Sequence, residues 1–519
     1  WGGRPGHDCA TLLCAGSRDF AYRRGEVWAL HVACAGNQVV YAERSTTDWR
    51  LLRGGERLLP GEVVLAPGET YSSPWLVGTW GTGLDEASTR IHDTLRARPQ
   101  HPRRPRPVLL NTWEATYFDH DLEHLLDLAD RAARIGVERY VLDDGWFGRR
   151  RDDTRGLGDW VVSQDVWPHG LRPLVDHVHA LGMEFGLWFE PEMVNLDSEV
   201  AEQHPEWLLQ TARGPGIPSR YQHVLDLAHP DAYAHVRDQM SALIAEYDIA
   251  YIKWDHNRPL VDAGHWPSGR PGVHEQTDAV LGLMAELKER HRGLEIESCA
   301  GGGGRIDLAT AEVADRFWTS DCIDAHERHR LDTATGLLVP PELLGVHVGA
   351  GTDHTTGRRL DLDFRAGTAL WGHLGIEWDL SAADARDLDR LASWVALHKE
   401  HRDLLHSGVV VHADTTNPAL QLDGVVARDG SEGLYKLSML EHSLIWPPGR
   451  VTLPGLDPTF RYLVTLVTPD RMPLPDTVIP PWARTGVTLS GQALAAIGIQ
   501  APYLLVDTLA VIHARALDA

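Results

Sequence analysis

The sequence has few cysteines, no long apolar run and a shortage of basic residues. The five cysteines among 519 residues are an odd number with no CxxC spacing, which argues against a disulfide framework and a structural zinc site. No segment reaches the roughly 18 consecutive apolar residues of a membrane-spanning helix. Lys and Arg number 49 against 73 Asp and Glu, and the resulting net charge of −24 disfavours nucleic acid and membrane surfaces as partners.

The first residues contain no apolar segment of the kind found in secretory signal peptides. Together with the low cysteine content, this favours a reducing, cytoplasmic location. Neither an HExxH motif nor another metal-binding spacing of histidines and carboxylates is present, so we expect no metal and no cofactor. Association into a homo-oligomer stays open.

Tryptophan is abundant and phenylalanine is scarce, with 19 residues of the first and 8 of the second. An indole combines a flat apolar face with an N–H donor, which suits the apolar faces and hydroxyl rims of sugars. Core packing is the more ordinary use of tryptophan, so the excess by itself is a weak indication of a carbohydrate site.

Short segments rich in valine and aromatic residues predict β-strands at Glu26–Ala33, Gln38–Glu43 and Glu62–Leu65. We therefore expect a partial β-sandwich domain over residues 1–98. Residues 99–107 are rich in proline and arginine, and in so acidic a chain they predict a solvated linker and not a nucleic-acid patch.

Residues 108–407 alternate short apolar strands with amphipathic helices, and this pattern predicts an α/β fold, the (β/α)8 TIM barrel. Helical spacing of leucine and alanine predicts helices near residues 122–136, 171–182 and 230–247. The eight predicted strands are Val108–Trp113, Arg139–Asp144, Glu184–Phe189, Tyr251–Asp255, Leu294–Cys299, Arg316–Asp321, Val346–Ala350 and Leu374–Trp378.

Residues 408–519 return to short β-like runs and predict a C-terminal β-sandwich domain. The predicted runs are Gly408–His412, Val425–Arg428, Leu434–Met439 and Tyr503–Asp507.

Carboxylates follow several of the predicted barrel strands, each with a tryptophan nearby. Asp143 and Asp144 end the second strand, Asp255 ends the fourth and Asp321 ends the sixth. Barrel enzymes place catalytic residues at these strand ends, so we expect a functional cluster. Paired carboxylates beside aromatic residues favour glycoside hydrolysis, in which one carboxylate attacks the anomeric carbon and the other protonates the leaving oxygen.

The local sequence gives a first indication of which carboxylate has which role. Asp255 lies two residues after Lys253, whose ammonium favours the ionised carboxylate that a nucleophile requires. Asp321 follows the apolar residues Phe317 and Trp318, where partial desolvation raises the pKa, as a general acid requires. Spacing alone leaves both assignments open.

Six strings resemble, in order, motifs of glycoside hydrolase family 36, the family of bacterial and fungal α-galactosidases. The resemblance implies a retaining α-galactosidase acting on terminal α-galactosides such as melibiose and raffinose, with Asp255 as nucleophile and Asp321 as acid/base. The strings are NTWEATYF (111–118), LDDGWF (142–147), WFEPEM (188–193), YIKWD (251–255), ESCAGGGGR (297–305) and WTSD (318–321).

The same resemblance implies the contacts to the sugar. Asp143 and Asp144 would accept hydrogen bonds from O4 and O6 of galactose, and Lys253 would contact hydroxyls on the other side of the ring. The glycine run would let the backbone approach the sugar closely. The remaining implied binding residues are Trp113, Trp188, Arg220, Asn257, Cys299, Gly301 and Gly302.

Other functions stay open at this point. An α-N-acetylgalactosaminidase or a galactosyl transferase would use the same aspartates, and a galactoside-binding protein without catalysis is an alternative of a different class. Family members carry a larger N-terminal β-supersandwich than the residues before this barrel can form, so we expect a truncated N-terminal domain.

Overall fold

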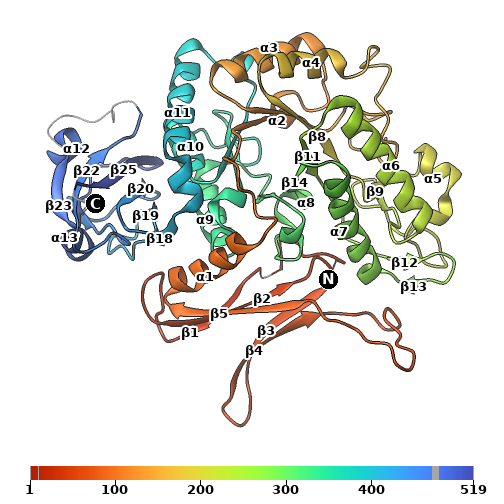
Figure 1. Cartoon of the computed structure of the whole chain (residues 1–519), viewed down its shortest axis with the longest axis horizontal. Helices are drawn as coiled ribbons and strands as arrows, with labels where there is room; N and C mark the ends of the chain where they lie inside the picture. Colours follow the sequence, from red (N-terminus) through yellow and green to blue (C-terminus); the bar gives the residue numbers. More distant parts are fainter. Residues whose placement is uncertain (1, 10, 470–478, 518–519) are drawn as a thin grey trace.

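A closed barrel of eight parallel strands forms the centre of the chain. The computed structural model describes residues 2–9, 11–469 and 479–517. The predicted domains 1–98 and 408–519 each include positions that lie outside these described residues. In Figure 1 the N-terminal strands lie below the barrel, and the C-terminal sheet lies beside helices α10 and α11.

The predicted TIM barrel is confirmed, and every predicted strand overlaps an observed one. The strands follow one another around the barrel in chain order. They are β6 (Leu109–Asn111), β7 (Arg139–Leu142), β8 (Glu184–Phe189), β11 (Tyr251–Trp254), β14 (Glu295–Ser298), β15 (Arg316–Trp318), β16 (Leu344–Gly349) and β17 (His373–Glu377).

Strand ends decide where the polar side chains lie. Parallel strands covered by helices are buried on both faces, which explains their apolar runs. Most of the observed strands stop before the predicted ends, so Asp143, Asp255 and Asp321 belong to the loops that follow β7, β11 and β15. The carboxylates therefore lie together at the C-terminal end of the barrel. The loops that carry them are free of sheet hydrogen bonds and can orient the side chains.

Helices surround the barrel at the positions that their leucine spacing predicts. Helix α3 buries Leu125, Leu128 and Ala132, and Asp121 caps it by accepting a hydrogen bond from the His124 N–H at 2.8 Å. None of the described helices is long and apolar enough to cross a membrane. The main helices are α3 (Leu122–Arg134), α4 (Arg172–Ala180), α6 (Pro230–Tyr247), α7 (Val273–Arg290), α9 (Ala325–Gly336), α10 (Leu362–Ala369) and α11 (Ala385–Ser407).

The N-terminal region consists of two antiparallel groups of strands. β1 (Leu13–Gly16), β2 (Glu26–Ala33) and β5 (Trp75–Thr82) form a three-stranded sheet, and β3 (Gln38–Arg44) pairs with β4 (Arg50–Glu56). The β3–β4 hairpin extends away from the barrel in Figure 1. Glu26–Ala33 and Gln38–Glu43 were thus correctly predicted as strands.

Two predictions for this region were wrong. The segment Glu62–Leu65 is a loop, because its glutamate is buried and accepts a hydrogen bond from the His274 N–H at 2.8 Å instead of alternating outward on a strand. Helix α1 (Leu84–Ala97) lies in a region predicted to be entirely β. Its buried face packs inward with residues at helical spacing, including Ala87, Ile91 and Leu95.

The C-terminal region is a six-stranded antiparallel sheet in the order β18–β19–β20–β25–β22–β23. The predicted strand Tyr503–Asp507 was wrong, since Asp507 has a left-handed φ of 56° and strand β25 begins only after it. The domain division at residues 98 and 407 stays a prediction. The strands are β18 (Val409–His412), β19 (Leu420–Val426), β20 (Glu432–Met439), β22 (Arg461–Leu466), β23 (Val487–Ser490) and β25 (Thr508–Ala516), beside a small pair, β21 (Arg450–Val451) and β24 (Ile499–Gln500).

The predicted linker, residues 99–107, is exposed over much of its length, and two of its arginines also join a charged cluster at the N-terminal ends of the barrel strands. Glu295, at the start of β14, accepts hydrogen bonds from Arg104 at 2.8 Å, Arg106 at 3.0 Å and Arg139 at 2.9 Å. Arg106 and Arg139 are fully buried. Burial alone would raise the pKa of Glu295, but the arginines, Arg139 first, hold it far below its usual value.

We expect Glu295→Gln to destabilise the barrel by about 3–5 kcal/mol, because two buried guanidinium groups lose their shared carboxylate. Urea denaturation at neutral pH measures this loss. The folded-state pKa of Glu295 is depressed, so its contribution is present above the unfolded pKa and is lost as the pH falls. The difference between variant and wild type therefore shrinks in acid.

The matched control is Glu312→Gln. This substitution removes a largely exposed carboxylate that lies 2.8 Å from Arg98. Exposed ion pairs contribute about 0–1 kcal/mol to stability, so the midpoint of urea unfolding of the control should lie near that of the wild type. Equal effects of the two substitutions would show that the buried cluster does not stabilise the barrel.

Candidate active site

Asp255 follows β11 and is buried with donors on both carboxylate oxygens. Oδ1 accepts hydrogen bonds from the N–H groups of His256 at 2.8 Å and Gly301 at 2.9 Å. Oδ2 accepts from Asn257 Nδ2 at 2.7 Å and from Trp188 Nε1 at 3.3 Å. Four donors directed at one carboxylate stabilise its negative charge.

The environment of Asp255 keeps it ionised. Burial would raise its pKa, but the positive charge of Lys253 and the hydrogen bonds from Gly301, Asn257 and His256 outweigh burial and lower the pKa below the usual value. Asp255 therefore carries a full negative charge across the neutral range, which a nucleophile requires.

The pKa of Asp321 is shifted in the opposite direction. Its Oδ1 accepts a hydrogen bond from Trp318 Nε1 at 2.9 Å, and one side of the residue remains exposed to solvent. Protein atoms fill most other directions, and this desolvation, followed by the negative charge of Asp255, raises the pKa of Asp321. A carboxyl group that retains its proton to higher pH is suited to general acid catalysis.

A glycine loop joins the two carboxylates. The Gly301 N–H donates to Asp255, while Gly302 lies so close to Asp321 that a Cβ there would be 2.5 Å from its Cγ. Both glycines have left-handed φ values, 67° and 66°. Any side chain at Gly302 would therefore displace Asp321, so the loop sets the positions of both aspartates at once.

Each member of the adjacent pair Asp143 and Asp144 has its own cation. Lys253 Nζ donates to Asp143 Oδ2 at 2.7 Å. Arg150 donates from Nε to both oxygens of Asp144 at 3.1 Å and from Nη2 to Oδ2 at 2.8 Å. Burial raises the pKa of Asp144 to about 6 even though Arg150 opposes it, so the carboxylate depends on this arginine for its charge.

The other predicted binding residues lie around the same loops. Arg220 is exposed and reaches the site through Asn257, donating from Nη1 to Oδ1 at 2.7 Å. Trp113 begins the short helix α2 (Trp113–Thr116), half-buried and edge-on to Tyr117. Trp188 is buried at the end of β8.

Cys299 directly follows β14 and is buried, and its N–H donates to the Trp254 carbonyl at 2.9 Å. Burial raises the pKa of its thiol well above the usual value, so the thiol is neutral. Cys299 is not joined to Cys322, which follows the neighbouring strand β15.

Two polar residues of the site, Arg150 and Glu190, were not predicted from the sequence to belong to it. Arg150 falls within a run of arginines, and a buried carboxylate pair that needs cations was the signal that could have singled it out. Glu190 is fully buried and accepts hydrogen bonds from the Asn257 N–H at 2.6 Å and Gln222 Nε2 at 3.2 Å. Burial and then the charge of Asp255 raise the pKa of Glu190 to about 8, so it is mainly protonated at neutral pH.

The first residues of the chain donate hydrogen bonds to backbone carbonyls of the glycine loop. Arg4 Nη1 donates to the Ala300 carbonyl at 3.0 Å, and His7 Nε2 donates to the Gly302 carbonyl at 2.7 Å. The Arg305 N–H donates to the Pro5 carbonyl at 3.1 Å. Nearly 300 residues of sequence separate these partners, so no local pattern could reveal the contact.

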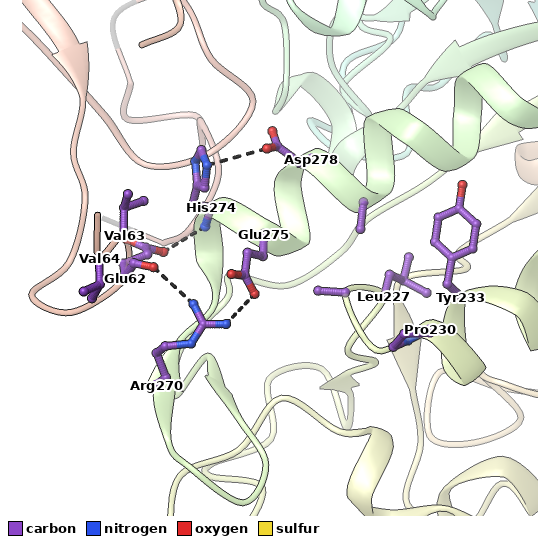
Figure 2. Close-up of a pocket in the computed structure, with 12 residues that line it drawn as sticks. Glu62, Val63, Val64, Leu227, Pro230, Tyr233, Arg270, His274, Glu275 and Asp278 are labelled. Carbon is purple, nitrogen blue, oxygen red and sulfur yellow. Dashed lines mark hydrogen bonds and ion pairs between the residues drawn. The ribbon is translucent and has the colours of Figure 1, made fainter. Parts of the chain in front are cut away.

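A separate hollow of about 740 Å³ lies between the N-terminal loop and helices α6 and α7, and neither Asp255 nor Asp321 lines it. Figure 2 shows Arg270 between Glu62 and Glu275, donating to the Glu62 carbonyl at 3.1 Å and to the Glu275 carboxylate at 2.6 Å. His274 is paired there with Asp278. Arg270 thus joins the N-terminal loop to helix α7, and we assign the hollow no part in the chemistry.

Comparison with known families agrees with this arrangement. Residues 70–408 match the Melibiase family model, and residues 2–66 match the model of the glycosyl hydrolase family 36 N-terminal domain. The alpha-galactosidase of Escherichia coli is 39% identical over 513 residues, which cover 97% of this chain and 72% of the relative.

The chain belongs to glycoside hydrolase family 36. The resemblance inferred from the motifs is thus confirmed, and the chain is a glycoside hydrolase of the α-galactosidase kind. Alpha-galactosidase AgaA from Geobacillus stearothermophilus is 35% identical over 89% of this chain, which spans 64% of that relative.

Solved family 36 structures share the fold of the whole described chain. The crystal structure of Geobacillus stearothermophilus AgaA superposes with a TM-score of 0.91 at 30% identity, covering 99% of this chain and 71% of that one. Variants of AgaA have been solved in complex with raffinose and with stachyose.

Substitution of Arg150 tests how this family 36 site keeps Asp144 charged. Without Arg150 the pKa of Asp144 rises, so at pH 7 fewer molecules carry the carboxylate. We expect Arg150→Met to lower kcat/KM on an aryl α-galactoside about 10–100-fold, since mismatched buried polar groups cost about 1–3 kcal/mol. The ratio of variant to wild-type kcat/KM should rise with pH as Asp144 ionises again.

Arg149→Met removes the exposed neighbouring arginine and serves as the control, with activity close to that of the wild type. A ratio for Arg150→Met that does not change with pH would mean that Arg150 supports the structure without setting the charge of Asp144.

Proposed function

We propose that the chain hydrolyses terminal non-reducing α-D-galactosyl groups with retention of configuration, through a covalent intermediate on Asp255. The proposal rests on the contrast between two carboxylates that contact one glycine loop. Asp255 has a lowered pKa and Asp321 a raised pKa, so Asp321 holds its proton to higher pH than Asp255 does.

In the first step, an oxygen of Asp255 attacks the anomeric carbon and the bond to the leaving oxygen breaks. Asp321 transfers its proton to that oxygen, so the leaving group departs as an alcohol. The electron pair of the broken bond stays on the leaving oxygen, and Asp255 becomes a neutral glycosyl ester.

The second step uses the change in charge that the first one creates. The negative charge of Asp255 contributes to the raised pKa of Asp321, and the ester removes that charge. The pKa of Asp321 therefore falls when the intermediate forms, which favours its role as the base that takes a proton from water. The water attacks the anomeric carbon, Asp255 leaves as a carboxylate, and two inversions restore the α configuration.

Selection of galactose rests on the paired carboxylates. Asp143 and Asp144 offer adjacent acceptors for O4 and O6, Lys253 offers a donor on the other side, and Trp113 and Trp188 offer apolar faces. Melibiose and raffinose-type oligosaccharides are the proposed substrates, and the raffinose and stachyose complexes of AgaA support this choice. Action in the cytoplasm stays a prediction.

Turnover by two glycine variants tests the roles of the aspartates. Asp255→Gly removes the nucleophile, so activity should collapse on every galactoside, and added azide should attack from the opposite face to give β-galactosyl azide. Asp321→Gly should lose about 10²–10⁴-fold on melibiose, whose leaving group needs a proton, and far less on aryl galactosides. Azide should then cleave the intermediate to give α-galactosyl azide.

NMR of the azide products decides between the roles. The same anomer from both variants, or the β anomer from Asp321→Gly, would contradict them. Asp262→Gly, at an exposed left-handed position with φ of 59° shortly after Asp255, is the matched control and should keep wild-type turnover. A wild-type protein that binds galactosides without turnover would instead be a binding protein.

A further inference from the structure

Three potential metal ligands from distant parts of the chain converge where the barrel meets the C-terminal sheet. His401 comes from helix α11, Glu432 begins strand β20, and His513 comes from strand β25. Glu432 Oε1 lies 2.7 Å from His513 Nε2 and 3.8 Å from His401 Nδ1. One ligand atom from each residue lies within 4.8 Å of the other two.

Two imidazoles and one carboxylate are a ligand set that Zn²⁺ adopts in proteins. With bonds of about 2.0–2.1 Å, the ligand atoms of a tetrahedral ion lie about 3.3 Å apart. The separations of 2.7 Å and 3.8 Å from Glu432 lie on either side of that value, and the two histidine nitrogens lie within 4.8 Å of each other. We propose that His401, Glu432 and His513 bind a zinc-class divalent cation.

The orientation of the two histidine rings agrees with this site. Their rings are 4.9 Å apart between centroids and inclined by 62°, so nitrogens from two directions face the carboxylate. A bound ion would take the place of the hydrogen bond between His513 Nε2 and Glu432 Oε1.

One side of the cluster is open to water. The side chain of His401 is 7% exposed, whereas those of His513 and Glu432 are 17% and 33% exposed. Water can thus enter and complete the coordination from the exposed side. Arg515 lies opposite Glu432 in the strand register. It is exposed, so its side chain can extend into solvent.

The consequence of metal binding is a bridge between two parts of the fold. Helix α11 closes the barrel, while β20 and β25 are adjacent central strands of the C-terminal sheet beside it (Figure 1). An ion shared by all three elements would bind the folded state and not the separated parts, so it would stabilise their contact. This inference does not depend on the proposed catalytic roles.

The test uses the full chain, dialysed against EDTA and then titrated with ZnCl2. Bound Zn²⁺ is measured by competition with a chromophoric chelator, and Tm is measured by calorimetry at each concentration. We expect saturable binding of one ion per chain at this site and a Tm that rises with Zn²⁺. MgCl2 should cause no such rise, because Mg²⁺ prefers octahedral oxygen ligands.

His513→Gln and, as a second variant, Glu432→Gln should each bind Zn²⁺ at least about tenfold more weakly and lose the Zn²⁺-dependent rise in Tm. Their Tm in EDTA should stay near that of the wild type, which shows that they fold. His177→Gln is the matched control, since His177 of α4 pairs with Asp130 of α3 at 2.8 Å, and no third ligand joins them among the described residues. If the variants and the control respond equally to Zn²⁺, or the wild type shows no rise, the site does not exist.

Discussion

One buried negative charge, on Asp255, shifts the pKa of the carboxyl groups around it. Lys253 and the N–H donors of the neighbouring loops keep this carboxylate ionised despite burial. Burial, and after it the charge of Asp255, raises the pKa of Asp321 and of Glu190, so both hold their protons to higher pH than usual. Neutralising Asp255 would therefore lower the pKa of both groups.

The barrel provides that charge with rigid surroundings. Its strands end just before the aspartates, so the reacting groups lie on short loops anchored in a buried sheet. The glycine loop after β14 contacts both Asp255 and Asp321, and Arg4 and His7 brace it from the N-terminal segment. At the opposite ends of the strands, arginines are paired with carboxylates whose role is structural.

Sequence predicted the parts of this architecture that depend on local pattern. Apolar runs located all eight barrel strands, and helical spacing located α6 from Pro230 to Tyr247. Errors arose where a long-range contact overrides the pattern: Arg106 lies in a proline-rich stretch yet is buried against Glu295. The convergence of His401 with Glu432 and His513 also depends on tertiary folding that no local spacing predicts.

Trapping of the covalent intermediate tests whether Asp255 is the nucleophile. A 5-fluoro-α-galactosyl fluoride forms the glycosyl ester quickly and releases it slowly, so the labelled protein can be digested and mapped by mass spectrometry. We expect one 5-fluorogalactosyl adduct, on the Asp255 side chain of the peptide that contains it. An adduct on Asp321, or turnover of the reagent without any covalent species in rapidly quenched samples, would contradict it.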